Sequence, residues 1–395
     1  MIRVDKIVPG GQGLVTLEDG KKAFFWNALP GEIIEEYTVT KNKSHYLEAV
    51  ATKVTHQSPY RVEPQDDCYL STSPWQIINY KHELQLKQEL IVEFFREQHI
   101  SITTPKIFTD GKDYHYRNKM EYALYWSHDT AKIQLAFHQR GSHRKLPITQ
   151  SSIEHPEIFT KAQQIIDQLN QNHDEARRYQ SLLLRCNQDG TVSGGLYENH
   201  CPHPTFSNLT DTILNHTYSY SPNGFFQINL PVYELALREI KKHITTDEVL
   251  DLYSGVGTIG LSTARSKQLT LVECDKFAYG EMVRNITNTS KPSNSNTIKS
   301  GNIQAVLAKS EEALNYITPN QTVILDPPRS GCHSALIDKL NIVRPESIIY
   351  LSCNPATQAR DIKELLNYYQ IETIKTYNFF PHTPHIENLV IMSRK

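Results

Sequence analysis

The spacing of hydrophobic and polar positions changes twice along this chain of 395 residues. In roughly the first sixty residues, short apolar runs alternate with glycine turns, which is typical of a small β-barrel. From Ser73 the apolar positions follow the helical period for about six turns, to Phe95, and a mixed region continues to His216. After His216, strand-length runs alternate with helical segments to the end. These patterns predict three domains, over residues 1–58, 59–216 and 217–395.

The alternation after His216 predicts an α/β domain built on a doubly wound parallel sheet. A polar segment over 285–300, rich in Asn, Ser, Thr and Lys, is expected to be mainly a loop. The predicted strands are 248–253, 269–273, 297–300, 322–326, 347–352, 371–378 and 388–393.

Composition limits the classes of protein to consider. The formal net charge is −2, so the overall field does not indicate a nucleic-acid partner, which local patches would have to hold. No apolar run approaches the ~18 residues of a membrane span, and the first residues lack the apolar segment of a secretory signal. The six cysteines show no C-x-x-C spacing, which argues against a zinc ribbon or a disulfide framework. We therefore expect a cytoplasmic enzyme without a metal site.

A glycine turn follows the apolar run that ends at Leu252. The segment Gly255-Val256-Gly257-Thr258-Ile259-Gly260 fits a nucleoside-binding turn, and Glu273 ends the next predicted strand, where a ribose-binding carboxylate belongs. Both dinucleotides and S-adenosylmethionine need such a turn. Asp251, four residues before Gly255, favours a methyltransferase, and no site for hydride transfer is evident. A plain strand-to-helix turn is the alternative without a ligand.

Two further motifs lie at predicted strand ends. Asp326 is followed by Pro327, Pro328 and Arg329, an acidic turn typical of methyltransferases that act on nucleobases or amides. Methylation of a nitrogen needs only this polar clamp, whereas carbon five of a pyrimidine must first be activated by a thiolate that adds to carbon six. Cys353 closes an apolar run before Asn354 and Pro355, so it is the candidate nucleophile.

This chemistry also needs a base that removes the proton from carbon five. Glu387 immediately precedes the last apolar run and is the candidate. His382 and His385 are rivals by residue type, although packing in a loop between two prolines explains them better.

Taken together, these motifs resemble the RNA uracil-C5 methyltransferase family, which forms 5-methyluridine in ribosomal or transfer RNA. The resemblance implies a class I methyltransferase domain that uses S-adenosylmethionine, with Cys353 as nucleophile and Glu387 as proton acceptor. Further site residues are implied by the resemblance or by the motifs. For the cofactor they are Gln227, Tyr253, Thr258, Glu273, Asn302 and Asp326, and for the RNA substrate Phe225, Phe226, Gln227, Asp326, Asn354, Arg117 and Lys119.

The N-terminal part resembles a TRAM domain, an OB-like barrel attached to many RNA-modifying enzymes, and the match rests on its glycines and on Leu29-Pro30-Gly31-Glu32. Many relatives with this domain carry four cysteines for an iron–sulfur cluster, three of them grouped before the first long helix. Here Cys68 alone remains in that group, and cluster ligation needs four thiolates or near equivalents. We therefore predict no iron–sulfur cluster, with Trp75 filling the volume.

The resulting hypothesis is a monomeric RNA uracil-C5 methyltransferase with a central α+β RNA-binding region. Aromatic and basic residues interleave at 114–122 and 132–138, a weak signature of nucleic-acid binding that a solvated sheet face explains nearly as well. The target uridine must leave its stack to reach Cys353. Ribosomal RNA, namely 23S, is the favoured substrate, and tRNA the alternative. A nucleobase N-methyltransferase and a non-catalytic RNA-binding protein are the other hypotheses.

Overall fold

The structure, a computed structural model, describes residues 2–198, 201–203, 206–287 and 295–395. It separates into two compact units. The first unit comprises Met1–Leu90, Lys112–Phe206 and Phe380–His385, and the second comprises Ile91–Gly111, Ser207–Phe379 and Ile386–Lys395. The division into three domains at 58 and 216 stays a prediction.

A six-stranded sheet with the order β1-β5-β6-β4-β3-β2 contains the N-terminal residues. Its core includes Val4, Val15, Phe25, Ile34 and Ala49. Buried positions alternate with more exposed ones in β3 and β4, as expected where one face of a strand covers a core. The strands are β1 (Ile2–Arg3), β2 (Lys6–Ile7), β3 (Gly13–Thr16), β4 (Lys22–Trp26), β5 (Ile33–Asn42) and β6 (Tyr46–Thr55).

A second six-stranded sheet follows in the first unit, in the order β10-β9-β8-β11-β12-β13. Helix α3 (Pro156–Leu169) packs against β9 and β11 through buried residues that include Ile158 and Ile166. The strands are β8 (Lys119–Ser127), β9 (Lys132–His138), β10 (Lys145–Pro147), β11 (Ser181–Cys186), β12 (Val192–Glu198) and β13 (Cys201–His203).

Helix α2 (Tyr80–Glu97) starts later than the apolar period predicted. Residues between Ser73 and Ile78 form tight turns instead, with backbone bonds from Gln76 N to Ser73 O and from Ile78 N to Trp75 O. The Oδ1 atom of Asn79 accepts a hydrogen bond from His82 N at 2.9 Å, which caps the first turn of α2. Two short helices, α1 (Tyr69–Thr72) and α4 (His173–Ala176), complete the unit.

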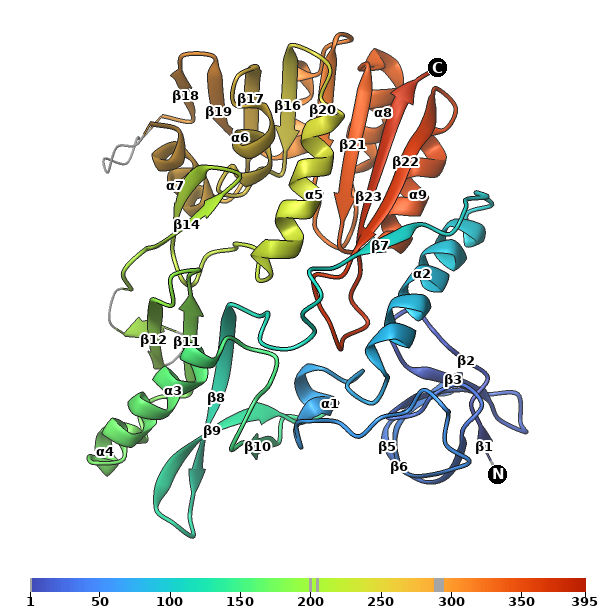
Figure 1. Cartoon of the computed structure of the whole chain (residues 1–395), viewed down its shortest axis with the longest axis vertical. Helices are drawn as coiled ribbons and strands as arrows, with labels where there is room; N and C mark the ends of the chain where they lie inside the picture. The colour runs from blue at the N-terminus through green and yellow to red at the C-terminus, as the bar shows by residue number, and fades with distance from the viewer. Residues whose placement is uncertain (1, 199–200, 204–205, 288–294) are drawn as a thin grey trace. The chain divides into compact units, whose positions relative to one another are not determined.

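The second unit is built on a nine-stranded sheet with the order β18-β19-β17-β16-β20-β21-β23-β22-β7 (Figure 1). Neighbouring strands from β19 to β21 are parallel, whereas β23 runs antiparallel to both β21 and β22. The strands are β7 (Lys106–Phe108), β16 (Glu248–Leu252), β17 (Gln268–Glu273), β18 (Thr297–Ser300), β19 (Ile303–Leu307), β20 (Gln321–Leu325), β21 (Ser347–Ser352), β22 (Tyr369–Tyr377) and β23 (Glu387–Arg394). The predicted doubly wound sheet is confirmed, with β18 and β23 as antiparallel additions.

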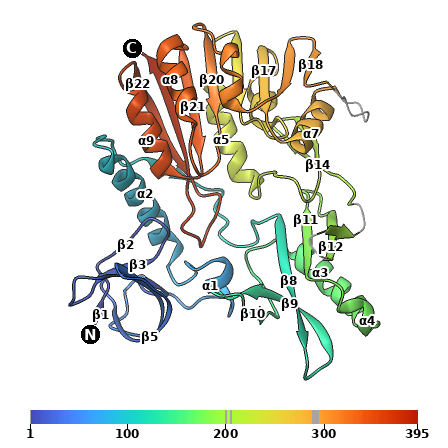
Figure 2. The ribbon, with the colours of Figure 1, turned by 180° about the vertical axis from the view of Figure 1, so that it is seen from behind.

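Helices cover both faces of this sheet. In Figure 1, α5 and α6 cross the near face, and the reverse view brings α8 and α9 forward (Figure 2). Every residue of β20 and β21 is buried, as expected for parallel strands covered on both sides. The helices are α5 (Leu230–Lys242), α6 (Thr258–Ala264), α7 (Lys276–Thr287), α8 (Ser334–Val343) and α9 (Pro355–Leu365), and a hairpin of β14 (Leu209–Ile213) and β15 (His216–Tyr220) precedes them.

The predicted strand at 297–300 has a different role from the one expected. It forms β18, which pairs antiparallel with β19 at the sheet edge, and β19 is the parallel neighbour of β17. The polar segment over 285–300 begins within α7, and its residues 288–294 lie outside the described part of the chain. None of the described helices is long and apolar enough to cross a membrane.

Candidate active site

The glycine turn connects β16 to α6 at the carboxyl edge of the sheet. Asp251 is fully buried, and its Oδ2 accepts a hydrogen bond from Gly260 N at 2.8 Å. Burial, aided by the charges of Asp326 and Glu273, raises the pKa of Asp251 to about 8. A Cβ atom on Gly260 would lie 2.5 Å from a Leu271 methyl carbon, so this position requires glycine. Asp251 thus ties the start of the helix to the strand.

The same turn leaves room for a nucleoside. Gly255 has a φ of +57°, and a Cβ atom there would meet nothing within 4 Å. Glu273 ends β17, and its two carboxylate oxygens accept hydrogen bonds from Gly255 N at 2.8 Å and Asp275 N at 2.7 Å. A carboxylate offers about four lone-pair sites, so acceptor capacity remains for ribose hydroxyls. The open turn and the carboxylate fit a nucleoside cofactor.

Tyr253 and Thr258 flank the turn. Tyr253 adopts a φ of +65°, an uncommon conformation for a bulky residue, and its hydroxyl interacts with Ser310 in the segment after β19. Burial raises the pKa of Tyr253. Thr258 is the first residue of α6 and is buried. Both predicted cofactor residues therefore lie at the carboxyl edge.

Tyr253 also lines a cavity of about 730 Å³ formed by segments that follow β16, β19 and β20 together with α8 and α9. Glu311, Cys332, Arg360 and Asp361 contribute to its wall. Among the residues that the structure describes, neither Cys353 nor Glu387 belongs to this lining. The cavity therefore borders the cofactor turn, and Cys353 and Glu387 lie outside its lining.

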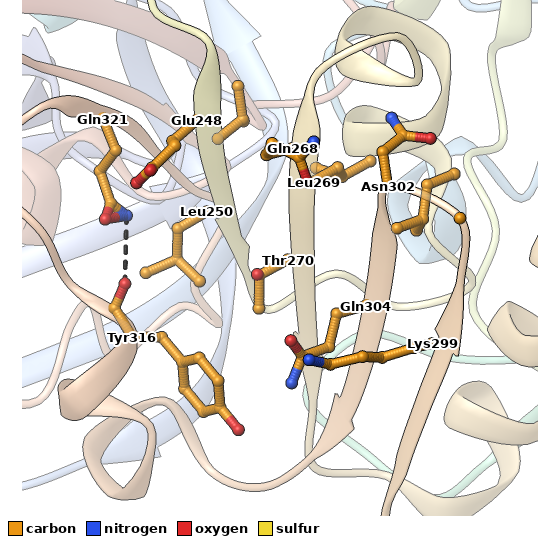
Figure 3. Close-up of a pocket in the computed structure, with 13 residues that line it drawn as sticks. Glu248, Leu250, Gln268, Leu269, Thr270, Lys299, Asn302, Gln304, Tyr316 and Gln321 are labelled. Atoms are coloured by element: carbon orange, nitrogen blue, oxygen red, sulfur yellow. Dashed lines mark hydrogen bonds between the residues drawn. The ribbon is translucent and has the colours of Figure 1, made fainter.

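Asn302 lies at the opposite edge of the sheet, in contrast to the other predicted cofactor residues. It precedes β19, and its Nδ2 donates hydrogen bonds to the carbonyl oxygens of Arg265, at 2.9 Å, and Lys267. Together with Glu248 and Gln268, which begin β16 and β17, Asn302 lines a separate cavity of about 160 Å³ (Figure 3). The resemblance implied Asn302 as a cofactor residue, and that role stays a prediction. The residues that follow β19 at the carboxyl edge are Ala308, Lys309 and Ser310.

The two adjacent phenylalanines differ in exposure. Phe226 is buried and stacks on Tyr220 with ring centroids 3.9 Å apart. Phe225 is 71% exposed. Gln227, the next residue, is buried. Of the predicted pair, Phe225 is therefore the residue that is exposed to solvent.

Cys353 and Glu387 come together through strand pairing. Strands β21 and β23 are antiparallel, and the last pair in their register is Ser352 with Asn388. Continued by one residue, this register sets Cys353 opposite Glu387, and directly opposed residues in antiparallel strands have Cα atoms about 4.5–5.5 Å apart. Asp326 follows β20, the parallel neighbour of β21. Glu387 lies 34 positions after Cys353, and Asp326 lies 27 positions before it. The three residues nevertheless meet at one edge of the sheet.

The electrostatics of this group agree with the pairing. Glu387 is 3% exposed, and burial followed by the charge of Asp326 raises its pKa well above the usual value. Removal from water raises the pKa of Asp326 to about 7. Burial and then the charges of Glu387 and Asp326 raise the pKa of Cys353 to about 11. Strongly perturbed carboxyl groups around a half-buried thiol are typical of a catalytic site.

Arg329 is a member of this group that sequence reasoning did not assign. Its positive charge lowers the pKa values of Cys353 and Glu387. Asn354, predicted to bind substrate, donates from Nδ2 to the carbonyl oxygen of Arg329 at 2.7 Å. The position of Arg329 directly after Asp326-Pro327-Pro328 was the available signal, since that turn ends the strand beside Cys353.

Arg117 and Lys119 lie in the first unit and are described within it. The Nε of Arg117 donates to the carbonyl oxygen of Lys119 at 2.8 Å, and Lys119 pairs with Arg185 across β8 and β11. Burial, followed by the charge of Arg185, lowers the pKa of Lys119 to about 8. These residues form a cationic cluster on the central sheet.

His382 and His385, the rival bases, are also grouped with the first unit. His382 is buried, with its ring stacked on Tyr114 and its Nε2 3.4 Å from the Asp113 carboxylate. His385 packs edge-on against Phe380. Both rings therefore have packing partners within this unit.

Comparison with known proteins shows which family the C-terminal part of this chain is similar to. Residues 209–395 match the tRNA (uracil-5-)-methyltransferase family. An uncharacterized RNA methyltransferase of Enterococcus faecalis is 28% identical over 100% of this chain and 97% of its own length. Another from Lactobacillus johnsonii is 26% identical over 95% of this chain and 94% of its own length. The resemblance predicted from the motifs is confirmed: the chain is similar to this family and to relatives that are named as RNA methyltransferases.

A solved structure supports the fold over the whole chain. The Pyrococcus abyssi tRNA (uracil-54, C5)-methyltransferase, in complex with S-adenosyl-L-homocysteine, superimposes with a TM-score of 0.74 at 23% sequence identity. The match covers 99% of this chain and 100% of that one. The predicted class I methyltransferase fold with a β-rich N-terminal part is confirmed.

Proposed function

We propose that this protein is an S-adenosylmethionine-dependent RNA (uracil-5-)-methyltransferase that forms 5-methyluridine. The observation that carries the proposal is the juxtaposition of Cys353 and Glu387 at the end of the β21–β23 ladder, beside Asp326. A thiol, a base and an acidic turn at one edge are what methylation of an unreactive pyrimidine carbon requires. The family match over 209–395 supports the same reaction.

Cys353 would act first. Its thiolate adds to C6 of uracil, forming a carbon–sulfur bond and moving an electron pair onto C5 and O4 as an enolate. S-adenosylmethionine supplies the methyl group that C5 takes up. Glu387 then removes the proton from C5, and the C6–S bond breaks to restore the double bond and the thiolate. A base with a raised pKa suits removal of a carbon proton, because its ionised form binds that proton more tightly.

Residues at the cofactor turn would hold S-adenosylmethionine. Glu273 would accept hydrogen bonds from the ribose hydroxyls, and Tyr253 and Thr258 would border the nucleoside. Gln227 would lie between the methyl donor and the uracil, and Asp326 would contact either the methionine end of the cofactor or the edge of the uracil. The segment after β19, which includes Ser310, would replace Asn302 in this set.

The substrate is structured RNA with its target uridine unstacked, since C6 of a stacked base is out of reach of Cys353. Phe225 offers an exposed ring for stacking, and Arg117 and Lys119 offer positive charge for the backbone. Residues 1–58 would act as a TRAM-like RNA-binding barrel, and we expect no iron–sulfur cluster because Cys68 alone remains of the grouped cysteines. The protein would work as a cytoplasmic monomer.

We propose 23S ribosomal RNA as the target, because bacterial members of the resembling family that carry a TRAM domain mostly act on ribosomal RNA. Transfer RNA is the second candidate, which the name of the matching family and the substrate of the Pyrococcus abyssi enzyme favour. Mapping 5-methyluridine in total RNA from cells with and without this protein distinguishes them. Loss of the modified base from 23S RNA supports the first target, and loss from tRNA supports the second.

RNA that carries 5-fluorouridine tests the reaction type. Fluorine cannot leave C5 as a proton does, so the methylated adduct with Cys353 should persist and migrate as a covalent protein–RNA complex under denaturing conditions. An N-methyltransferase would transfer the methyl group without forming this complex. A non-catalytic RNA-binding protein would bind the RNA and transfer nothing, and a Cys353→Ala variant would then keep its cellular role.

A further inference from the structure

We propose that Phe277 and Phe225 form a two-ring stacking platform, on which unpaired bases of the RNA stack next to the target uridine. The inference rests on the proposed function and deepens it, because it names the kind of RNA that the site accepts. It also assigns Phe277, a residue to which neither the motifs nor the family resemblance gave a role.

Two phenylalanine rings of the second unit are exposed although they are apolar. Phe225 is 71% exposed and Phe277 is 51% exposed. Among the described residues of this unit, the third exposed aromatic side chain is Tyr368, and the guanidinium of Arg344 lies over its ring, 3.9 Å from the centroid. Exposed apolar surface that is gathered in one place indicates a binding surface.

A turn between Ser221 and Gly224 brings the two rings together. Gly224 N donates to Ser221 O at 3.1 Å, which closes the turn. Ser221 N donates to Oε1 of Glu281, one helical turn after Phe277 in α7, at 2.6 Å. A Cβ atom on Gly224 would lie 3.6 Å from Phe277 Cε1. The Phe277 ring therefore lies close to the backbone that directly precedes Phe225.

Helix α7 also joins these rings to the cofactor turn. The side chain of Asn285 in α7 is buried, and it accepts a hydrogen bond from Ser219 N at 2.9 Å and donates one to Val256 O at 3.1 Å. Phe277 lies in the first turn of the same helix, four residues after Glu273. One helix therefore holds the stacking platform next to the turn that is predicted to bind the cofactor.

An unpaired nucleobase is the partner that this surface fits. The flat face of any base can stack on a phenyl ring, and a base that has left its own helix needs such a partner. Lys276, directly before Phe277, is exposed and supplies positive charge for the phosphates. The family match over 209–395 includes both rings and supports an RNA substrate. Base-paired RNA keeps the faces of its bases covered, so the platform selects a strand with unpaired nucleotides around the target.

Binding of a short oligouridine strand, labelled with a fluorophore at one end, tests the platform without methyl transfer. Fluorescence anisotropy at one fixed salt concentration gives the dissociation constant. Phe277→Ala should weaken binding at least about fivefold, and Phe225→Ala by a similar factor, since each removes a ring on which a base stacks. The same strand paired with oligoadenosine should bind wild type more weakly, with little difference among the variants.

Two control variants separate stacking from a general loss of apolar surface. Phe277→Tyr keeps an aromatic ring and should bind the single strand as wild type does. Ile342→Ala shortens an exposed apolar side chain on α8 and should leave binding unchanged. Unchanged affinity in Phe277→Ala would overturn the inference, as would a wild-type protein that binds the single strand no more tightly than the duplex.

Two other occupants of the Phe277 ring give different results. Weaker binding of S-adenosyl-L-homocysteine by Phe277→Ala in calorimetry, with unchanged affinity for the strand, would assign the ring to the cofactor. Dimerisation of wild type in analytical ultracentrifugation that Phe277→Ala abolishes, again with unchanged affinity for the strand, would assign the ring to a second copy of the chain. Either result would overturn the inference.

The 5-fluorouridine experiment on the wild-type protein keeps the two proposals separate. If wild type forms the covalent RNA complex but Phe277→Ala binds the single strand normally, the proposed function stands and the stacking platform fails. If Phe277→Ala loses affinity for the single strand while wild type forms no covalent complex, the platform stands and the proposed reaction fails.

Discussion

The two edges of the nine-stranded sheet share one backbone architecture but carry different polar chemistry. At the amino edge, the hydroxyls of Thr246, Thr322 and Ser347 form a buried chain with oxygen separations of 2.8 and 2.9 Å. At the carboxyl edge lie the carboxyl groups of Asp251, Asp326 and Glu387, all with raised pKa values. Neutral hydroxyls that hydrogen-bond to one another stabilise a fold. Closely spaced acids with raised pKa values can instead take up and release protons near neutral pH.

Both edges also contain a cavity, so a cavity alone does not identify the reacting site. The amino-edge cavity is lined by amides and hydroxyls such as those of Gln304, Thr270 and Tyr316, together with the charged side chains of Glu248 and Lys299 (Figure 3). The carboxyl edge adds a thiol and a cation to its acids. In an open α/β sheet, ligands bind beyond the carboxyl ends of the strands, and the chemistry here follows that rule.

The sharpest test of the comparison is one substitution at each edge. Cys353→Ala should reduce methyl transfer to RNA by at least ~10³-fold, because no other group can form the covalent adduct. Gln304→Ala at the amino edge should change the rate by no more than about twofold, as expected for a substitution away from the reacting groups. Transfer of labelled methyl groups to RNA measures both, with Cys274→Ala as the matched cysteine control. Equal losses at the two edges would contradict the assignment.

Removal of the base should slow the reaction at a later step. Glu387→Gln should lower turnover by ~10²–10⁴-fold, the usual contribution of a positioned base. Because addition of the thiolate and methylation precede proton removal, the covalent complex should accumulate even on ordinary RNA. Denaturing gels after a single turnover would reveal it. A slow variant without a trapped adduct would assign proton removal to another group.

The packing of the cofactor turn can be tested by paired glycine substitutions. Gly260→Ala should destabilise the protein by ~1–3 kcal/mol, because its Cβ atom would clash with Leu271 and with the Asp251 carboxylate. Gly280→Ala in α7 meets nothing within 4 Å and should instead stabilise by ~0.5–1 kcal/mol. Urea unfolding measures both. Equal effects would mean that the contact between α6 and the strands is looser than described.

The smallest expected effect is a pH dependence of stability from Asp251. Its pKa is raised to about 8, so the folded protein retains a proton that the unfolded chain releases. This stabilising contribution is complete below the unfolded value near ~3.9 and is lost as pH rises through about 8. In Asp251→Asn, the decline in stability between these limits should be shallower, as measured by urea midpoints. An unchanged slope would place the titration on Asp326 or Glu387.

Much of the second unit could be predicted from local sequence because its strands are continuous apolar runs. The runs at 248–253, 322–326 and 347–352 correspond to β16, β20 and β21. The turn after β16 could be predicted from its glycines and Asp251. Pairing between strands that are distant in sequence could not be predicted in the same way. The run at 297–300 looked like another strand of the parallel sheet, yet it pairs antiparallel with β19 at the sheet edge.

The sequence alone was enough to propose Cys353, Glu387 and the cofactor turn as site residues, because residue type and position after an apolar run indicate the chemistry. Tertiary structure decided which of these groups meet. The insertion of β23 between β21 and β22 brings the start of β23, with Glu387, to the end of β21 that precedes Cys353, and Phe226 stacks on Tyr220 in the interior. The backbone bonds that fix Arg329 beside Asn354 join residues 25 positions apart. Strand order and register depend on the free energy of packing the whole sheet, which no local pattern encodes.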